Sequence, residues 1–110
     1  MNIISVLIFC FGLLLSSITT ATEMNQLIEY MAQRPIIKKS MYVRIAIMHE
    51  AKHLARSDGI KPTSDEFKRK GAQYGAKAVA LLKQRCTEGT LTKNNGNPES
   101  DCKIIHQIKN

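Results

Sequence analysis

Two long segments of the chain repeat apolar residues with the spacing of an amphipathic α-helix. At about 100° per residue, one broad apolar side of residues 40–57 consists of Val43, Ile47, Met48, Ala51, Leu54 and Ala55. Ser40 precedes this side as an N-cap, because its hydroxyl can accept a hydrogen bond from a free amide of the first turn. Gly59 follows the segment, where a left-handed residue ends many helices. We therefore expect a central helix that ends near Ser57.

The second long segment predicts a helix over residues 64–86. Thr63 and Glu66 have the spacing of a capping box, with Thr63 as the N-cap. The apolar side of this helix consists of Phe67, Tyr74, Ala78, Val79, Leu81 and Leu82.

Two glycines lie on the apolar side of this second helix. Gly71 and Gly75 are one turn apart, although glycine costs about 1 kcal/mol relative to alanine inside a helix. Their place on the packing side indicates the close approach of another helix. Because the central helix carries the small residues Ala51 and Ala55, we expect it to be that neighbour.

Two shorter segments predict further helices. Residues 23–33 show a helical apolar stripe that Pro35 ends, and residues 99–108 follow Pro98, which suits a first helical turn. Residues 36–39 are interpreted as a short connector. Because the sequence shows no strand alternation, internal repeat or heptad array, we predict an all-α fold, a small bundle of about four helices.

The N-terminal segment has the pattern of an export signal. An uninterrupted apolar run over residues 3–15 is followed by small and polar residues, with Thr19 and Ala21 at positions suited to signal-peptidase cleavage. The run is short for a membrane span. We therefore predict a cleaved signal peptide over residues 1–21 and a single domain over residues 22–110, with an uncleaved anchor as the alternative.

The cysteine content agrees with export. Cys10 lies in the predicted signal peptide, which leaves Cys86 and Cys102. An even pair in a small exported domain predicts one disulfide bond. Two free thiols or half of a metal site are the alternatives. The destination, periplasmic or secreted, stays open.

One chemical motif lies in the central helix. His49 and His53 flank Glu50 in the H-E-x-x-H form of zinc metallopeptidases, in which two histidines one turn apart bind the metal and the glutamate acts as general base. Asp58 and His106 are the candidate third ligands. The motif predicts zinc as the cofactor of this alternative.

The surroundings of the motif argue against catalysis. The continuation of one large peptidase class would require glycine and histidine where the chain has Arg56 and Gly59. Lys52 places a cation inside the motif, and the domain is short for a peptidase cleft. A non-enzyme without a cofactor is therefore favoured over a zinc-dependent hydrolase.

The charge balance restricts the partner class. Sixteen basic residues against nine acidic residues give a net charge of +7. Few aromatic side chains and a single tight basic cluster, residues 68–70, argue against nucleic acid. An acidic protein, an anionic envelope polymer or weak contact with a membrane surface fits this charge, although a merely solvated charged face also explains it.

The polar side of the central helix is the predicted contact surface. It carries Tyr42, His49, His53 and Arg56, opposite the apolar stripe. Our leading hypothesis is an exported, disulfide-stapled interaction protein: an inhibitor, an immunity-type protein, a chaperone or an accessory subunit. The alternatives are a zinc-binding protein or minimal metallopeptidase, and a cationic domain that binds anionic lipid.

Overall fold

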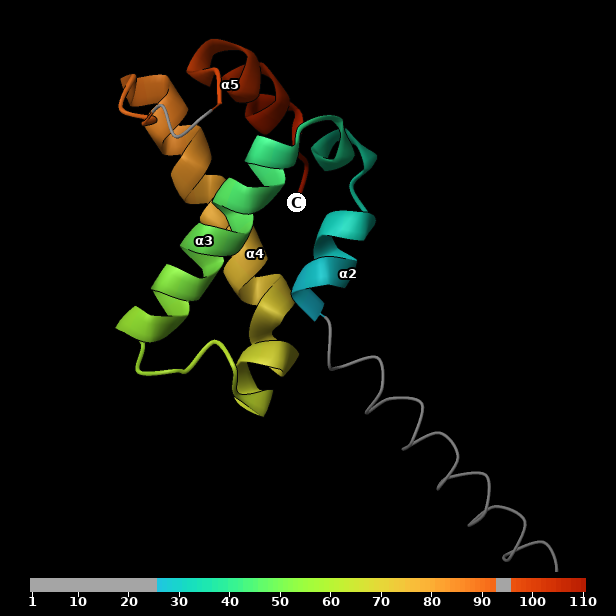
Figure 1. Cartoon of the computed structure of the whole chain (residues 1–110), viewed down its shortest axis with the longest axis vertical. Coiled ribbons are helices and arrows are strands. Elements are labelled where there is room, and N and C mark those ends of the chain that lie inside the picture. Colours follow the sequence, from blue (N-terminus) through green and yellow to red (C-terminus); the bar gives the residue numbers. More distant parts are fainter. Residues whose placement is uncertain (1–25, 93–95) are drawn as a thin grey trace, which may run out of the picture.

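Two long helices, α3 (Met41–Ser57) and α4 (Asp65–Glu88), cross at the centre of the computed structural model (Figure 1). The structure describes residues 26–92 and 96–110. The other elements, in chain order, are the helix α2 (Gln26–Ala32), the 3-10 helix η1 (Pro35–Lys39) and the helix α5 (Pro98–Gln107). These described residues form four α-helices and no strand, which confirms the all-α prediction.

The predicted signal peptide, residues 1–21, lies outside the described residues, as do residues 23–25 of the first predicted helix. Among the helices that are described, none is both long enough and apolar enough to cross a membrane.

The caps of α3 are those that the sequence predicts. The Ser40 hydroxyl accepts a hydrogen bond from the amide of Val43 at 3.3 Å. At the other end, Gly59 has φ of 78°, in the left-handed region that a residue with a Cβ rarely adopts. The Ser40 hydroxyl therefore fixes the start of this helix, and the left-handed backbone of Gly59 fixes its end.

The start of α4 differs from the prediction by one residue. Ser64, not Thr63, is the N-cap, and its hydroxyl accepts from the amide of Phe67 at 3.2 Å. Thr63 and Ser64 both carry a hydroxyl that can cap a helix. Ser64 is the residue with the extended backbone conformation of an N-cap. Glu66 does not complete a capping box; its carboxylate pairs with Lys70 at 3.0 Å. The helix also continues to Glu88, beyond the expected end.

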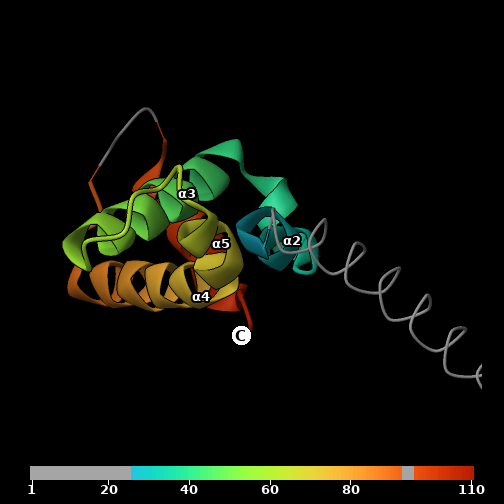
Figure 2. The ribbon, with the colours of Figure 1, turned by 90° about the horizontal axis from the view of Figure 1, so that it is seen from below.

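All five helical elements contribute to one core. Its buried apolar residues are Leu27, Tyr30, Met31, Ile37, Val43, Ile47, Ala51, Ala55, Phe67, Tyr74, Ala78, Val79, Leu82, Ile105 and Ile108. Ile37, from the segment interpreted as a connector, is fully buried because η1 turns it under the bundle. Figure 2 shows α3 lying over α4, with α2 at one end of the pair.

The glycines of α4 contact α2, not α3. A Cβ at Gly71 would lie 3.0 Å from the Leu27 Cβ and closer still to the Leu27 backbone nitrogen. A Cβ at Gly75 would lie 2.7 Å from the Tyr30 ring. The prediction of close helix approach is confirmed, but its expected partner is wrong. Because Gly71 and Gly75 have no side chain, α2 can pack directly against the backbone of α4.

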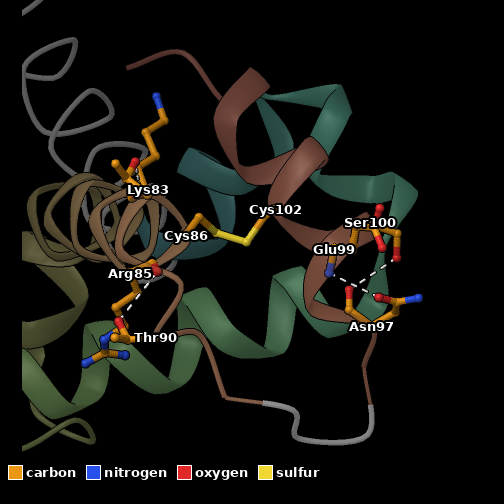
Figure 3. Close-up of a disulfide and its surroundings, with 9 residues drawn as sticks. Lys83, Arg85, Cys86, Thr90, Asn97, Glu99, Ser100 and Cys102 are labelled. Atoms are coloured by element: carbon orange, nitrogen blue, oxygen red, sulfur yellow. Dashed lines mark hydrogen bonds between the residues drawn. A yellow bond between two sulfur atoms is a disulfide. The ribbon is translucent and has the colours of Figure 1, made fainter.

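The disulfide between Cys86 and Cys102 fastens α5 to the end of α4 (Figure 3). The two Cα atoms are 5.6 Å apart. Asn97 caps α5 by accepting from the amide of Glu99 at 3.1 Å. The predicted disulfide is thus confirmed, and it indicates an oxidising compartment.

Residues 108–110 are fastened to α2 and α4. Arg34 donates from Nε to the Lys109 carbonyl at 2.7 Å, and the Tyr30 hydroxyl donates to Asn110 Oδ1. From α4, Lys83 Nζ donates to the Ile108 carbonyl at 2.5 Å. The contacts of Arg34 and Tyr30 join residues 75 and 80 positions apart in sequence.

A buried tyrosine joins α4 to the end of α3. The Tyr74 hydroxyl donates to Asp58 Oδ2 at 2.7 Å. This hydrogen bond favours the protonated phenol and is the largest cause that raises the pKa of Tyr74 to about 12; burial and the nearby carboxylates of Asp58 and Glu66 act in the same direction.

Candidate interaction surface and adjoining cavity

The four predicted contact residues lie on the exposed side of α3. Tyr42, His49, His53 and Arg56 are all exposed, while the opposite side of the helix is buried in the core. Their spacing of seven, four and three residues keeps them on one side over almost the whole helix. The structure therefore brings them together as one continuous strip.

Two large apolar residues extend this strip, and the sequence analysis missed them. Met41 is 58% exposed and Ile45 is 54% exposed, beside Tyr42 at 43%. Ile45 lies between Tyr42 and His49 on the helix, outside the apolar stripe that packs inward. The position of Ile45 outside this stripe could have been predicted from the helical spacing. Apolar side chains gathered at one exposed place are typical of contact surfaces.

A cavity of about 320 Å³ opens beside this strip. It lies between the first part of α3, the last part of α4, residues 91, 92 and 96 of the connecting segment, and α5. Its apolar walls include Val43, Leu82 and Ile105, which are almost completely buried, and Tyr42 and His49 also line it. The cavity therefore joins an apolar interior to the exposed side of α3.

Glu50, the acid of the H-E-x-x-H motif, forms an ion pair between helices. Its Oε1 lies 2.5 Å from Nη1 of Arg85 on α4. Glu50 is only 9% exposed, and its Oε2 is buried without a hydrogen-bond partner among the described residues. Both side chains line the cavity. Because a buried carboxylate needs a compensating cation, this contact gives Glu50 a structural role.

The described residues contain no cluster of three or more histidine, cysteine, aspartate or glutamate side chains placed to hold one metal ion. His49 and His53 lie one turn apart on α3 and are exposed. Asp58, a candidate third ligand, accepts a hydrogen bond from Tyr74. His106, the other candidate, lies exposed on α5. The structure brings together only the two histidines of the motif.

Asp101 supplies a second carboxylate to the cavity. Its Oδ1 accepts from the Ser40 hydroxyl at 3.1 Å, which joins α5 to the start of α3. Gly96 completes this side: a Cβ there would lie 2.5 Å from Asp101 Oδ2 and 3.2 Å from the Tyr42 Cβ. Sequence reasoning missed Arg85, Asp101 and Gly96, because only the folded chain brings them to the motif.

Comparison with protein-family models, curated proteins and solved structures finds no match for this chain.

Proposed function

We propose that this domain is a non-enzymatic interaction protein that binds a protein partner through the α3 face. The α3 face is defined as the strip Met41, Tyr42, Ile45, His49, His53 and Arg56. The observation that carries the proposal is the exposure of Met41, Tyr42 and Ile45 side by side at one end of α3. A helix that faced only water would place polar residues there.

The composition of the α3 face supports a protein partner. Burying exposed apolar area in a contact contributes about 25 cal/mol per Å². Tyrosine and arginine are frequent anchors of protein interfaces, and Tyr42 and Arg56 lie toward opposite ends of the strip. The net charge of +7 favours an acidic partner, because long-range attraction speeds encounter.

The expected compartment of the protein restricts the kinds of interaction protein that it could be. The disulfide favours an oxidising location, which fits an exported inhibitor, immunity-type protein, chaperone or accessory subunit. The Glu50–Arg85 ion pair supports a non-enzymatic role, since it occupies the carboxylate that a zinc hydrolase of this motif would use as its base.

Paired charge substitutions test the α3 face. Ile45→Glu places a charge in the strip, whereas Ile28→Glu places one at an equally exposed isoleucine on α2, 57% exposed. Both variants should keep the far-UV circular dichroism of the oxidised protein. Quantitative pull-down from the exported fraction of the source cell should lose the bound partner with Ile45→Glu and keep it with Ile28→Glu. Equal retention by both variants contradicts the proposal.

The zinc alternative stays a prediction with its own measurement. It requires stoichiometric zinc in the oxidised protein, lost in the His49→Ala/His53→Ala double variant. Isothermal titration with zinc on both proteins separates this alternative from the interaction role. Tight binding in the wild type alone would favour the metal site, and peptidase assays of Glu50→Gln would follow.

A further inference from the structure

An open hollow of about 370 Å³ lies where the start of η1 meets the end of α5. Of the six described residues that line it, two are cations, two carry amides, two are apolar and none is acidic: Gln33, Arg34, Pro35, Ile36, Gln107 and Lys109. Figure 1 shows the C-terminal end of the chain beside α2 and η1. The hollow therefore has positive walls, whereas the cavity beside α3 contains two carboxylates.

The guanidinium of Arg34 is held in place by its neighbours. Its Cζ atom lies 3.7 Å from the centre of the buried Tyr30 ring, a cation–π contact. Nε donates to the Lys109 carbonyl at 2.7 Å, and Nη1 donates to the Tyr30 carbonyl at 2.8 Å. The side chain is half-buried, and these contacts fix the plane of its guanidinium group. A donor that is already fixed loses little conformational entropy when it binds a ligand.

These contacts leave part of the Arg34 guanidinium available for binding. Arginine carries five N–H donors, and the described residues accept from two of them. Both acceptors are neutral carbonyls, which do not compensate the positive charge. The ion pairs of the described residues form at Lys68, Lys70 and Arg85. Neither Arg34 nor Lys109 has an acidic partner among these residues.

We propose that this hollow binds the oxyanion of a small acid, a carboxylate or phosphate group on a short apolar body, with the free N–H groups of Arg34 donating to its oxygen atoms. A guanidinium presents its donors in a planar fork that matches the oxygens of such a group. Lys109 adds a second positive charge, and Pro35 and Ile36 contact the apolar body. The site goes beyond the α3 face and does not rest on the proposed function, because none of its residues belongs to that face.

Nuclear magnetic resonance of the ¹⁵N-labelled, oxidised protein tests this site with three probes that share an ethyl body. Propionate and ethylphosphonate carry an oxyanion, and propionamide is their neutral control. Both anions should shift the side-chain Nε signal of Arg34 and the amide signals of Ile36 and Lys109, with half-saturation in the millimolar range. Propionamide should shift none of these signals. The anion that binds more tightly assigns the site to carboxylates or to phosphates.

Two variants distinguish the planar fork from general attraction to a basic protein. Arg34→Lys keeps the charge but removes the fork, and it should weaken propionate binding roughly 10-fold, as expected for the loss of one hydrogen bond to a charged group. Gln107→Glu adds a carboxylate to the exposed wall of the hollow and should weaken binding several-fold through repulsion. It leaves the contacts of Arg34 in place, which preserves the test if Arg34→Lys loosens residues 108–110.

Gln73→Glu is the matched control, because it makes the same charge change at an exposed residue of α4 outside the hollow and should leave binding unchanged. Equal weakening by Gln107→Glu and Gln73→Glu would mean that the anions follow only the net charge of +7, and this would overturn the proposal. Equal shifts from propionamide and propionate, or no shift at millimolar anion, would overturn it as well. Ile45→Glu should leave these titrations unchanged, and Gln107→Glu should keep the partner in the pull-down, so failure of this site and failure of the α3 face are distinguishable.

Discussion

Substitution of Gly71 by alanine measures how closely α2 approaches α4. Inside a free helix this change would raise stability by about 1 kcal/mol. In this fold the new methyl group would overlap the Leu27 backbone nitrogen and lie 3.0 Å from the Leu27 Cβ. Overpacking of this kind costs about 1–3 kcal/mol, and backbone cannot rotate away as a side chain can. The overpacking cost should therefore lie in the upper part of that range. After the gain from helix propensity is subtracted, we expect the free energy of unfolding to fall by about 1–2 kcal/mol.

Urea unfolding of the oxidised protein, followed by far-UV circular dichroism, gives the change in the free energy of unfolding. Ala80→Gly is the control, because Ala80 is exposed on the same helix and should lose about 1 kcal/mol through helix propensity alone. Hydrogen exchange should show faster opening of α2 in Gly71→Ala and not in Ala80→Gly. A Gly71→Ala variant that gains stability would refute the close contact between α2 and α4.

Three further predictions concern cross-links between helices. The Cys86→Ser/Cys102→Ser variant should lose about 3 kcal/mol of unfolding free energy, since the bridge closes a loop of 16 positions; unchanged urea midpoints would contradict this. Tyr74→Phe should cost about 1 kcal/mol at neutral pH. Because the folded pKa of Tyr74 is raised from 10.0 to about 12, its contribution is complete below pH 10 and lost as pH rises toward 12, so the stability difference between wild type and Tyr74→Phe should shrink over that interval. Arg85→Ala should cost about 3 kcal/mol, the lower end of the range for breaking a buried ion pair, because it leaves the Glu50 carboxylate buried and unpaired whereas Arg85 itself is partly exposed. A double-mutant cycle with Glu50→Ala should show coupling between the two residues.

Local chemistry explains which parts of the fold the sequence could predict. The hydroxyl of Ser40 and the left-handed Gly59 act within a few residues, so both ends of α3 were readable. At the start of α4, Thr63 and Ser64 offer nearly equivalent caps, and no local pattern selects between them. The pairing of Cys86 with Cys102 needed only counting, once the N-terminal segment was interpreted as a signal.

The remaining features depend on contacts between distant residues. The sequence indicated that a helix approaches Gly71, but α2 and α3 both offered apolar sides for that contact. The partner of Glu50 lies 35 positions further along the chain, so its ion pair was not predictable from helical spacing. The cavity beside α3 exists only because α5 is brought there by the fold.

The fastening of α2 to residues 108–110 has a consequence for biosynthesis. A ribosome releases the chain from its N-terminus, so the residues of α2 emerge long before Lys109 and Asn110, to which Arg34 and Tyr30 are bonded. Until then α2 lacks part of its native contacts. The packing of α2 against the rest of the domain is therefore completed only after these residues have been synthesised.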